Sequence, residues 1–350
     1  MYVYILLILL IVILAFSENQ VNSGKTASFV FLVVFLLFAF RSYDVGVDTL
    51  GYILEYNYGE SDLRGVDLGF TAYTTLLSEL GVSSRLFLAI SSLIMLFPYL
   101  LYINKSGTPR LFTILLYITI GTFTMQLSGL RQSMAVSFIT LGVVLSAEIK
   151  RSFPRYLVLI GSVLLAETFH HTGIIGLLFV PMFIVMDKKW HVKESWLLLL
   201  AFLPVFLFFT SSIFAPLVDE LMSSRYEKYQ TGTQNINIIA FFLIPYFIFL
   251  YVLWLVRRVG LDDKYDRIGF LCAIVSILSA SASMYMPILS RIEYYFSLPM
   301  LVLITHLTNK LNVSIRRLLF GAIGVVCILF FLVSTDGGIL QIDNYQFSLE

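Results

Sequence analysis

The chain has 350 residues, of which 59% are hydrophobic and 13% are charged, with a formal net charge of +1 and a mean hydropathy of +0.89. No single core is large enough to hide so many apolar side chains, so this composition excludes a water-soluble protein. The absence of CxxC, GxxxxGK[ST] and HExxH patterns gives no basis for soluble-type nucleotide or zinc chemistry, and we expect no nucleic-acid partner. Cys272 and Cys327 lie inside apolar runs and are expected to be small core side chains.

Apolar runs of roughly 15 to 22 residues recur along the chain and are typical of transmembrane helices. The first run, which begins at Tyr2, has no basic region before it and no small-residue cleavage site after it, so we interpret it as a helix rather than a signal peptide. The runs predict an all-α, polytopic integral membrane protein with a single transmembrane domain over residues 1–350. The twelve predicted segments are 2–16, 27–41, 86–104, 110–128, 131–147, 155–169, 172–187, 195–217, 237–256, 267–287, 293–309 and 318–334.

Residues 155–187 are ambiguous because two short apolar segments meet at His170 and His171. A segment of about 15 residues is short for a hydrocarbon core of about 30 Å at about 1.5 Å per residue. This stretch is therefore either two spans or a re-entrant hairpin that leaves and returns to the same side.

Lys and Arg residues concentrate in alternate connections. Sixteen lie in one set, namely Lys25, Lys105, Arg110, Lys150, Arg151, Arg155, Lys188, Lys189, Lys193, Arg257, Arg258, Lys264, Arg267, Lys310, Arg316 and Arg317. Seven lie on the opposite side, namely Arg41, Arg64, Arg85, Arg131, Arg225, Lys228 and Arg291. Short basic loops stay in the cytoplasm, so we expect the first set inside and both termini outside. The larger outer loops are then residues 42–85, which are acidic, and residues 218–236.

In this orientation the unusual polar residues gather at the outer ends of the segments. They are Arg41, Asp44, Asp48, Arg131, Gln132, His170, His171, Arg291 and Glu293. Charged groups near hydrocarbon are costly and mark functional sites by default. Their one-sided distribution therefore predicts a site on the outer face.

Three outer segment ends share a geometry that suits an anion. Ser128 is the expected cap of segment 131–147, which has Arg131 and Gln132 in its first turn, and Arg291 precedes segment 293–309 in the same way. Segment 172–187 begins after His170 and His171. Helix N-termini present unpaired N–H groups, and an arginine adds a planar donor fork that matches phosphate oxygens. The pattern predicts a phospholipid or polyprenyl phosphate headgroup at the outer leaflet.

Structural alternatives remain for most of these residues. A juxtamembrane arginine often anchors a helix at the interface, and we assign Arg64, Arg85, Arg225 and Lys228 to that class. Asp44 and Asp48 are equally suited to cap turns, and Glu293 to pair with an arginine. The aromatic stretch 291–296 is equally typical of an interfacial belt and of a sugar-binding platform.

Four stretches together resemble the EpsG-like group of Wzy polysaccharide polymerases. They are FRSYDVGVDTLGY (40–52), SGLRQSMAVSF (128–138), FHHTGII (169–175) and RIEYYF (291–296). Arg41 and Asp48 match one element of the family pattern, Arg131 and Gln132 the second, His170 the third and Arg291 the fourth. The resemblance spans residues 40–300 and implies a multi-pass enzyme of the bacterial cytoplasmic membrane that acts at its outer face.

The resemblance implies a glycosyl transfer between two lipid-linked substrates, without a metal or another cofactor. The partners would be undecaprenyl-pyrophosphate-linked oligosaccharides and membrane lipid, together with a chain-length regulator and a flippase of the same pathway. Arg131, Arg291 and Arg41 would hold the pyrophosphate, and Asp48 would orient a sugar or the base. His170 would be the base that deprotonates the acceptor, because imidazole takes up a proton near neutral pH. His171 would point about 100° away on a helix.

Two other function classes remain open. A polysaccharide-lipid flippase would need charged residues at mid-helix and on both faces, which the one-sided cluster disfavours. An O-antigen ligase or a membrane acyltransferase would also pair an outer arginine with a histidine. An acyltransferase would need an acyl donor from the cytoplasm, and the inner loops contain no histidine besides His191.

The charge distribution makes a testable prediction about topology. A reporter that is active only in the cytoplasm should work when fused after Lys189 or Arg258, and should fail after Asp67 or Lys228, because the first two follow the basic loops. Reporter activity in whole cells measures this. The reverse pattern would invert the orientation and move the predicted site to the inside.

Overall fold

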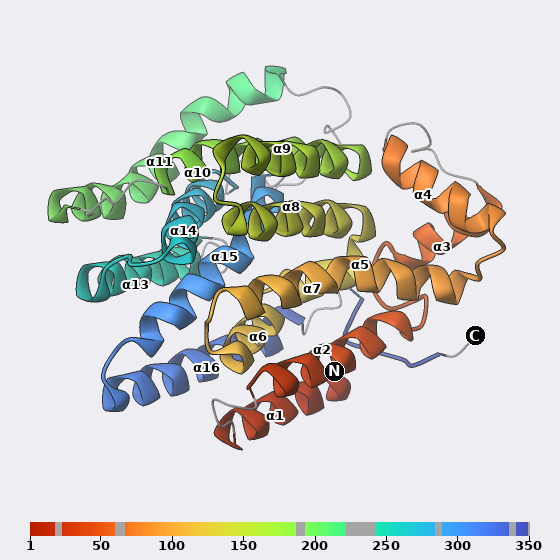
Figure 1. Cartoon of the computed structure of the whole chain (residues 1–350), viewed down its shortest axis with the longest axis horizontal. Coiled ribbons are helices and arrows are strands. Elements are labelled where there is room, and N and C mark those ends of the chain that lie inside the picture. Colours follow the sequence, from red (N-terminus) through yellow and green to blue (C-terminus); the bar gives the residue numbers. More distant parts are fainter. Residues whose placement is uncertain are drawn as a thin grey trace. The chain divides into compact units, whose positions relative to one another are not determined.

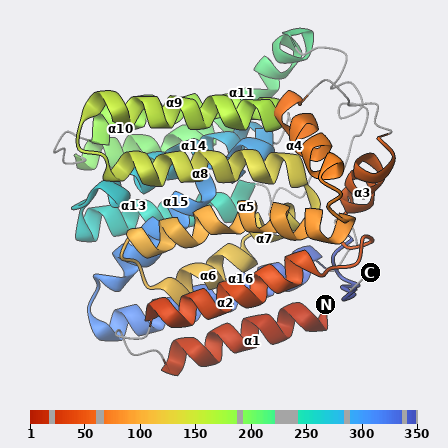
Figure 2. The ribbon, with the colours of Figure 1, turned by 45° about the vertical axis from the view of Figure 1, so that its right-hand side comes forward.

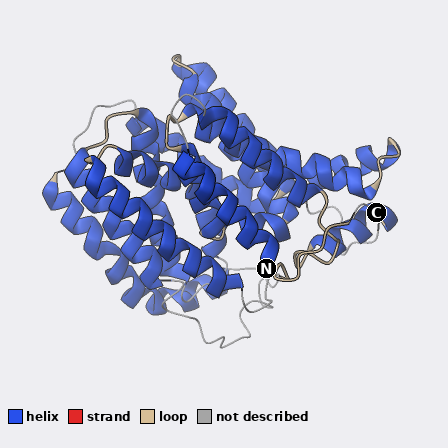
Figure 3. Ribbon diagram, turned by 90° about the horizontal axis from the view of Figure 1, so that it is seen from below, coloured by secondary structure: helices blue, strands red, loops and turns tan. Residues whose placement is uncertain are grey.

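The structure is a computed structural model that describes residues 1–17, 23–59, 67–186, 193–221, 242–283, 289–335 and 341–348. Within these ranges the chain consists of helices and their connections, with one isolated antiparallel bridge between Arg41 and Phe347 (Figure 3). The chain divides into two compact units, Met1–Pro181 with Asn312–Glu350 (unit 1) and Met182–Leu311 (unit 2). The single transmembrane domain therefore stays a prediction.

Each predicted apolar segment has a helical counterpart, and only residue 187 of the seventh, residues 237–241 of the ninth and residues 284–287 of the tenth lie outside the described residues. The counterparts are α1 (Tyr2–Ser17), α2 (Ser23–Ala39), α5 (Ser84–Lys105), α6 (Arg110–Thr119) with α7 (Thr122–Ser128), α8 (Leu130–Glu148), α9 (Ser152–Phe169), η1 (His171–Leu178) with α10 (Phe179–Met186), α11 (Glu194–Leu221), α13 (Ile244–Val259), α14 (Lys264–Ser283), α15 (Ser290–Asn309) and α16 (Val313–Thr335).

Five of these helices, α5, α8, α9, α14 and α16, are long and apolar enough to cross a membrane, and α6 with α7 adds a sixth if the bent pair is one span. Four further apolar stretches of 10–17 residues, at 2–15, 24–39, 171–186 and 195–210, are shorter. A multi-pass membrane protein is therefore confirmed. The count of twelve spans and the side on which the termini lie stay predictions.

The expected outer loop at residues 42–85 contains two helices, α3 (Thr49–Tyr58) and α4 (Leu68–Glu79), and its place on the outer side stays a prediction. Both are short and only partly apolar, so hydropathy alone does not reveal them. Of the second expected loop, residues 218–221 belong to α11 and residues 222–236 lie outside the described residues.

The predicted segment 110–128 is broken, since α6 and α7 meet at an angle of 58°. Gly121 occupies the break with a φ of +86°, a left-handed conformation that suits glycine. The expected cap at Ser128 is also wrong. Ser128 is the buried last residue of α7, and Gly129 is the N-cap of α8.

The long helices of unit 1 form a row in which α5 lies between α2 and α8, and α8 lies between α5 and α9 (Figures 1 and 2). α6 packs against α1, α2 and α16. α3 and α4 lie across one end of this row, which is also the end where both termini lie (Figure 2).

Several contacts define this end of unit 1, which we call the α3–α4 end. Arg85, at the start of α5, donates to the carbonyl oxygen of Ala39 at the end of α2 over 3.3 Å. The C-terminal segment reaches the same place, because Ser42 N donates to Gln346 O over 2.8 Å. At the opposite end, Arg155 Nε donates to Ile149 O over 2.9 Å. Arg155, a basic residue of one predicted inner loop, thus lies away from the α3–α4 end.

The stretch 155–187 reverses direction at His170, and η1 then runs back along α9. Two glycines allow the close approach. A Cβ on Gly173 would lie 2.6 Å from the backbone of Ala166 and Glu167, and one on Gly176 would lie 2.6 Å from Ile139 Cδ1. The chain therefore runs out along α9 and returns along η1 toward the side from which α9 starts. Both expectations for this stretch, two spans and a re-entrant hairpin, include such a reversal.

In unit 2, α14 packs closely against α15. A Cβ on Gly269 would lie 2.6 Å from the carbonyl oxygen of Pro299 and 2.7 Å from Leu303 Cβ, so these helices meet backbone to backbone at this point. The Tyr251 hydroxyl of α13 forms a hydrogen bond with the Thr308 hydroxyl of α15 over 2.8 Å.

The two cysteines, Cys272 in unit 2 and Cys327 in unit 1, are buried and form no disulfide, which confirms their interpretation as core side chains.

The close approach at Gly173 yields a testable prediction. Gly173→Ala should destabilise the purified protein by about 1–3 kcal/mol, because the added methyl group meets backbone atoms that cannot rotate away. Thermal unfolding in detergent measures this. Gly161→Ala is the matched control, since nothing lies within 4 Å of its Cβ and α9 gains a better helix former. Equal melting temperatures for the two variants would contradict the packing described here.

Candidate active site

The Arg131 guanidinium, in the first turn of α8, forms ion pairs with two carboxylates. Its Nη2 pairs closely with Glu55 of α3, and its Nη1 lies 3.4 Å from an oxygen of Asp67, the N-cap of α4. All three side chains are at most 9% exposed. We call Arg131, Glu55 and Asp67 the arginine cluster. α3 and α4 are thus joined to α8 by charge.

Aromatic rings flank the guanidinium. Its carbon lies 5.5 Å from the ring centre of Tyr52 and 4.9 Å from that of Phe70, both within cation–π range. Burial raises the pKa of the Tyr52 phenol above its usual value, Asp48 raises it further, and Arg131 opposes both. Tyr52 therefore stays neutral, and the one guanidinium of the arginine cluster faces two carboxyl groups.

The turn that precedes α3 is anchored on the connection to α8. Thr49 Oγ1 donates to the carbonyl oxygen of Leu127 over 3.3 Å and to that of Val45 over 2.8 Å. Gly46 lies so close that an added Cβ would be 2.3 Å from Leu127 O, and its φ is +93°. The stretch VGVDT, which begins at Val45, and the stretch GLRQ, which begins at Gly129, therefore meet at the α3–α4 end.

The start of α4 is pressed against the end of α9. A Cβ on Gly69 would lie 2.2 Å from Thr168 Oγ1 and 3.0 Å from Phe169 Cδ2. The Phe169 ring contacts Phe70 at 6.4 Å and Phe138 at 4.8 Å between ring centres. Because Phe70 also flanks Arg131, the arginine cluster and the stretch FHHTG belong to one packed region.

His170 is the N-cap of η1. Its Nδ1 accepts a hydrogen bond from the Thr172 backbone N–H over 3.3 Å and lies 2.7 Å from Thr172 Oγ1. The His171 ring is stacked on it, with ring centres 4.8 Å apart and planes inclined by 20°. The expected divergence of the two side chains is wrong, because His170 precedes the helix instead of lying within it.

The other predicted residues of unit 1 are dispersed. Arg41 is 1% exposed, and its Nη1 donates to the carbonyl oxygen of Phe38 over 2.6 Å. Gln132 is buried beside Arg131 in α8, whereas Asp44 and Asp48 are exposed. Asp48 occupies the N-cap position of α3 without a side-chain capping bond.

Arg291 and Glu293 lie in the first turn of α15, in unit 2. Their predicted association with Arg131, which belongs to unit 1, stays a prediction.

The comparison with known proteins agrees with this convergence of motifs. The sequence model of the EpsG family matches residues 25–347, nearly the whole chain and all four stretches that carry the resemblance.

The chain belongs to the EpsG family.

This is a family of Wzy-like polysaccharide polymerases, so membership indicates a role in polysaccharide biosynthesis. No curated protein and no solved structure matches the chain.

Sequence reasoning missed four residues of this candidate site, namely Tyr52, Glu55, Asp67 and Phe70. A signal for two of them was present. Asp48, Tyr52 and Glu55 follow one another at intervals of four and three residues, the spacing that puts side chains on one helix face. Asp67 and Phe70 carry no comparable local pattern, because their role depends on packing against distant segments.

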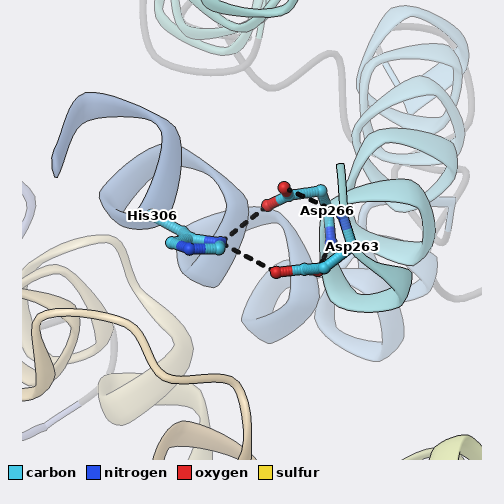
Figure 4. A group of neighbouring side chains, drawn as sticks. All are labelled: Asp263, Asp266 and His306. Carbon is cyan, nitrogen blue, oxygen red and sulfur yellow. Dashed lines mark hydrogen bonds and ion pairs between the residues drawn. The ribbon is translucent and has the colours of Figure 1, made fainter. Parts of the chain in front are cut away.

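A second charged cluster lies in unit 2 of the EpsG-family chain, between α14 and α15 (Figure 4). His306 Nδ1 lies 2.8 Å from Asp266 and 3.4 Å from Asp263, and the other oxygen of Asp266 accepts from Lys310 over 3.0 Å. These three His and Asp donor atoms lie within 4.8 Å of one another, a spacing compatible with a metal ion.

A structural role accounts for the same contacts. Asp263 Oδ1 accepts from Asp266 N over 2.8 Å, which caps α14, and Lys310 supplies a positive charge. His306 lies in the last turn of α15, where a positive charge is favoured. We therefore assign this cluster to the joining of α14 and α15.

Removing only the positive charge of the arginine cluster should cost more stability than removing all three of its charged groups. Arg131→Met should destabilise the protein by about 3–5 kcal/mol, because two buried carboxylates lose their counter-charge. Adding Glu55→Gln and Asp67→Asn should recover most of that loss, since no buried charge then remains. Unfolding of the purified protein in detergent measures both. A triple variant as unstable as Arg131→Met would show that the charges do not control stability here.

Proposed function

We propose that this EpsG-family protein polymerises polysaccharide repeat units at the outer face of the bacterial cytoplasmic membrane. It transfers a growing glycan from undecaprenyl pyrophosphate to a repeat unit carried on a second lipid. The observation that carries this proposal is the buried Arg131 at the N-terminus of α8, at the end of unit 1 where three family-like stretches meet.

The leaving group in this reaction is already a pyrophosphate, so the enzyme mainly has to hold its charge, exclude water and accept a proton. Arg131 adds a guanidinium to the positive end of the α8 dipole, and no side chain caps that helix. Its Nη atoms are engaged by Glu55 and Asp67, and its buried Nε has no hydrogen-bond partner among the described residues. The Nε–H donor of the guanidinium therefore remains for a phosphoryl oxygen.

The remaining predicted residues take supporting roles in the proposal. Arg291, in the first turn of α15, supplies a second guanidinium at a helix N-terminus. Arg41, Asp44, Asp48, Gln132, His171 and Glu293 bind or orient the two lipid-linked substrates. The acceptor proton needs a base, and unit 1 offers the His170 imidazole and the carboxylates of the arginine cluster as candidates.

A deletion strain tests the proposal. Loss of a polymerase should leave single repeat units on the lipid carrier, exposed on the outer face, whereas loss of a flippase would strand them inside. Extracted lipid-linked sugars and their accessibility to an impermeant reagent distinguish the two. Single units confined to the inner side would overturn the polymerase.

A matched pair of variants tests whether the planar guanidinium of Arg131 is needed, and not only its positive charge. Arg131→Lys with Glu55→Gln keeps one positive charge opposite one carboxylate but loses the fork, so polymer length should collapse at normal protein level. Glu55→Gln alone is the control. Full-length polymer from the double variant would show that Arg131 acts through its charge alone.

A further inference from the structure

Two buried atoms of opposite hydrogen-bonding character lie unpaired in the arginine cluster. Arg131 Nε is a donor and Asp67 Oδ1 is an acceptor, and neither has a hydrogen-bond partner among the described residues. The residues that carry them are 5% and 6% exposed. An unsatisfied buried polar atom costs about 1–3 kcal/mol, so both atoms favour a ligand that supplies the complementary group.

The two carboxylates of the arginine cluster are not equivalent. Glu55 forms the closer pair with Arg131, while Asp67 contacts it over 3.4 Å through Oδ2. Asp67 thus keeps its other oxygen for a second donor while Arg131 still compensates its charge. Of the two, Asp67 is the better placed to receive a proton.

The hydrogen bond at His170 decides which ring nitrogen carries its proton. The Thr172 backbone N–H can only donate, and the Thr172 hydroxyl, whose oxygen lies 2.7 Å from Nδ1, can donate to the same lone pair, so we assign Nδ1 as the acceptor. The neutral ring then carries its hydrogen on Nε2, and no lone pair remains for an acceptor hydroxyl. In this arrangement His170 is a hydrogen-bond donor through Nε2, whereas a general base needs an unprotonated nitrogen.

We propose that Asp67 is the catalytic base of the glycosyl transfer and that His170 acts as a hydrogen-bond donor to the substrate. This inference rests on the proposed polymerase function. The acceptor hydroxyl donates to Asp67 Oδ1, and Arg131 Nε donates to an oxygen of the leaving pyrophosphate. The acceptor and the donor together therefore supply a hydrogen-bond partner to both unpaired atoms.

The chemistry is a single displacement. The acceptor oxygen forms a bond to the anomeric carbon, and the bond from that carbon to the pyrophosphate oxygen breaks, with its electron pair leaving on the pyrophosphate. The acceptor proton moves to Asp67 Oδ1 and passes later to water. Configuration at the anomeric carbon is inverted, since attack and departure occur on opposite faces.

Access to this pair requires a local movement. Tyr52 and Phe70 flank the guanidinium, and Asp67 begins α4, so entry of the acceptor displaces side chains of the first turns of α3 and α4. The closed arrangement keeps bulk water from a donor that water would otherwise hydrolyse.

The test uses purified full-length protein in nanodiscs, with lipid-linked repeat units as donor and acceptor. Asp67→Asn should lower turnover by about 10² to 10⁴-fold while donor binding holds. Glu55→Gln is the matched control, because it removes the same charge from Arg131 and leaves Asp67 in place. Its turnover should exceed that of Asp67→Asn by at least about ten-fold, because only Asp67→Asn removes the proposed base.

Chemical rescue separates a base from a merely structural carboxylate. With Asp67→Ala, added azide should attack the anomeric carbon, release the pyrophosphate lipid and form a glycosyl azide of inverted configuration, which mass spectrometry detects. An ordered water held between Asp67 and Arg131 would explain the unpaired atoms without catalysis. In that case Asp67→Asn and Glu55→Gln would lose turnover equally and no azide product would form.

The role of His170 has its own readout. His170→Gln retains an N–H donor near the position of Nε2 but accepts no proton near neutral pH, so it should exceed His170→Ala in turnover by about ten-fold, the worth of one hydrogen bond. Equal and severe losses of turnover in both His170 variants, together with an active Asp67→Asn variant, would show that His170 and not Asp67 is the base. Absence of polymer from the wild-type protein would overturn the polymerase itself, which distinguishes the two failures.

Discussion

The buried guanidinium of Arg131 is the interaction on which the rest of unit 1 depends. A charge so poorly exposed is tolerable only if opposite charges accompany it, and Glu55 and Asp67 are brought to it by two helices that do not belong to the long apolar row. Compensation of one side chain thus explains why α3 and α4 lie across the end of that row. It also explains why the same end gathers the turn before α3, the start of α8 and the end of α9.

Net charge gives this arrangement its chemical character. One arginine lies between two carboxylates, so the arginine cluster contains one more carboxylate than guanidinium. In the proposed reaction, the guanidinium and this second carboxylate would be complementary to the departing pyrophosphate and the attacking hydroxyl. Membership of the EpsG family and this charge arrangement support the same chemistry from independent directions.

Much of the fold could be predicted from hydropathy, because continuous apolar runs have few alternatives to helices in a membrane. The break at Gly121 and the helices α3 and α4 could not, since the first needs one backbone conformation and the others are short and amphipathic. The cap assigned to Ser128 failed for a similar reason, because a second helix already ends there.

For the site, Arg131 and His170 were recognisable because charged and titratable groups are rare in apolar sequence. The partners of Arg131 were not, since Asp67 and Glu55 lie 64 and 76 residues away along the chain and only packing brings them together. The tautomer of His170 also depends on a local bond that no residue pattern displays.

The tight contact of Gly69 against Thr168 and Phe169 has a consequence for how the two substrates bind. With no space between the first turn of α4 and the last turn of α9, a shift that admits a ligand at Asp67 also displaces the residue before His170. Occupancy of one position then changes the free energy of binding at the other, and thermodynamic reciprocity makes the effect equal in both directions. In the proposed reaction, the hydroxyl held by Asp67 and the group that accepts a hydrogen bond from His170 would therefore bind as coupled ligands.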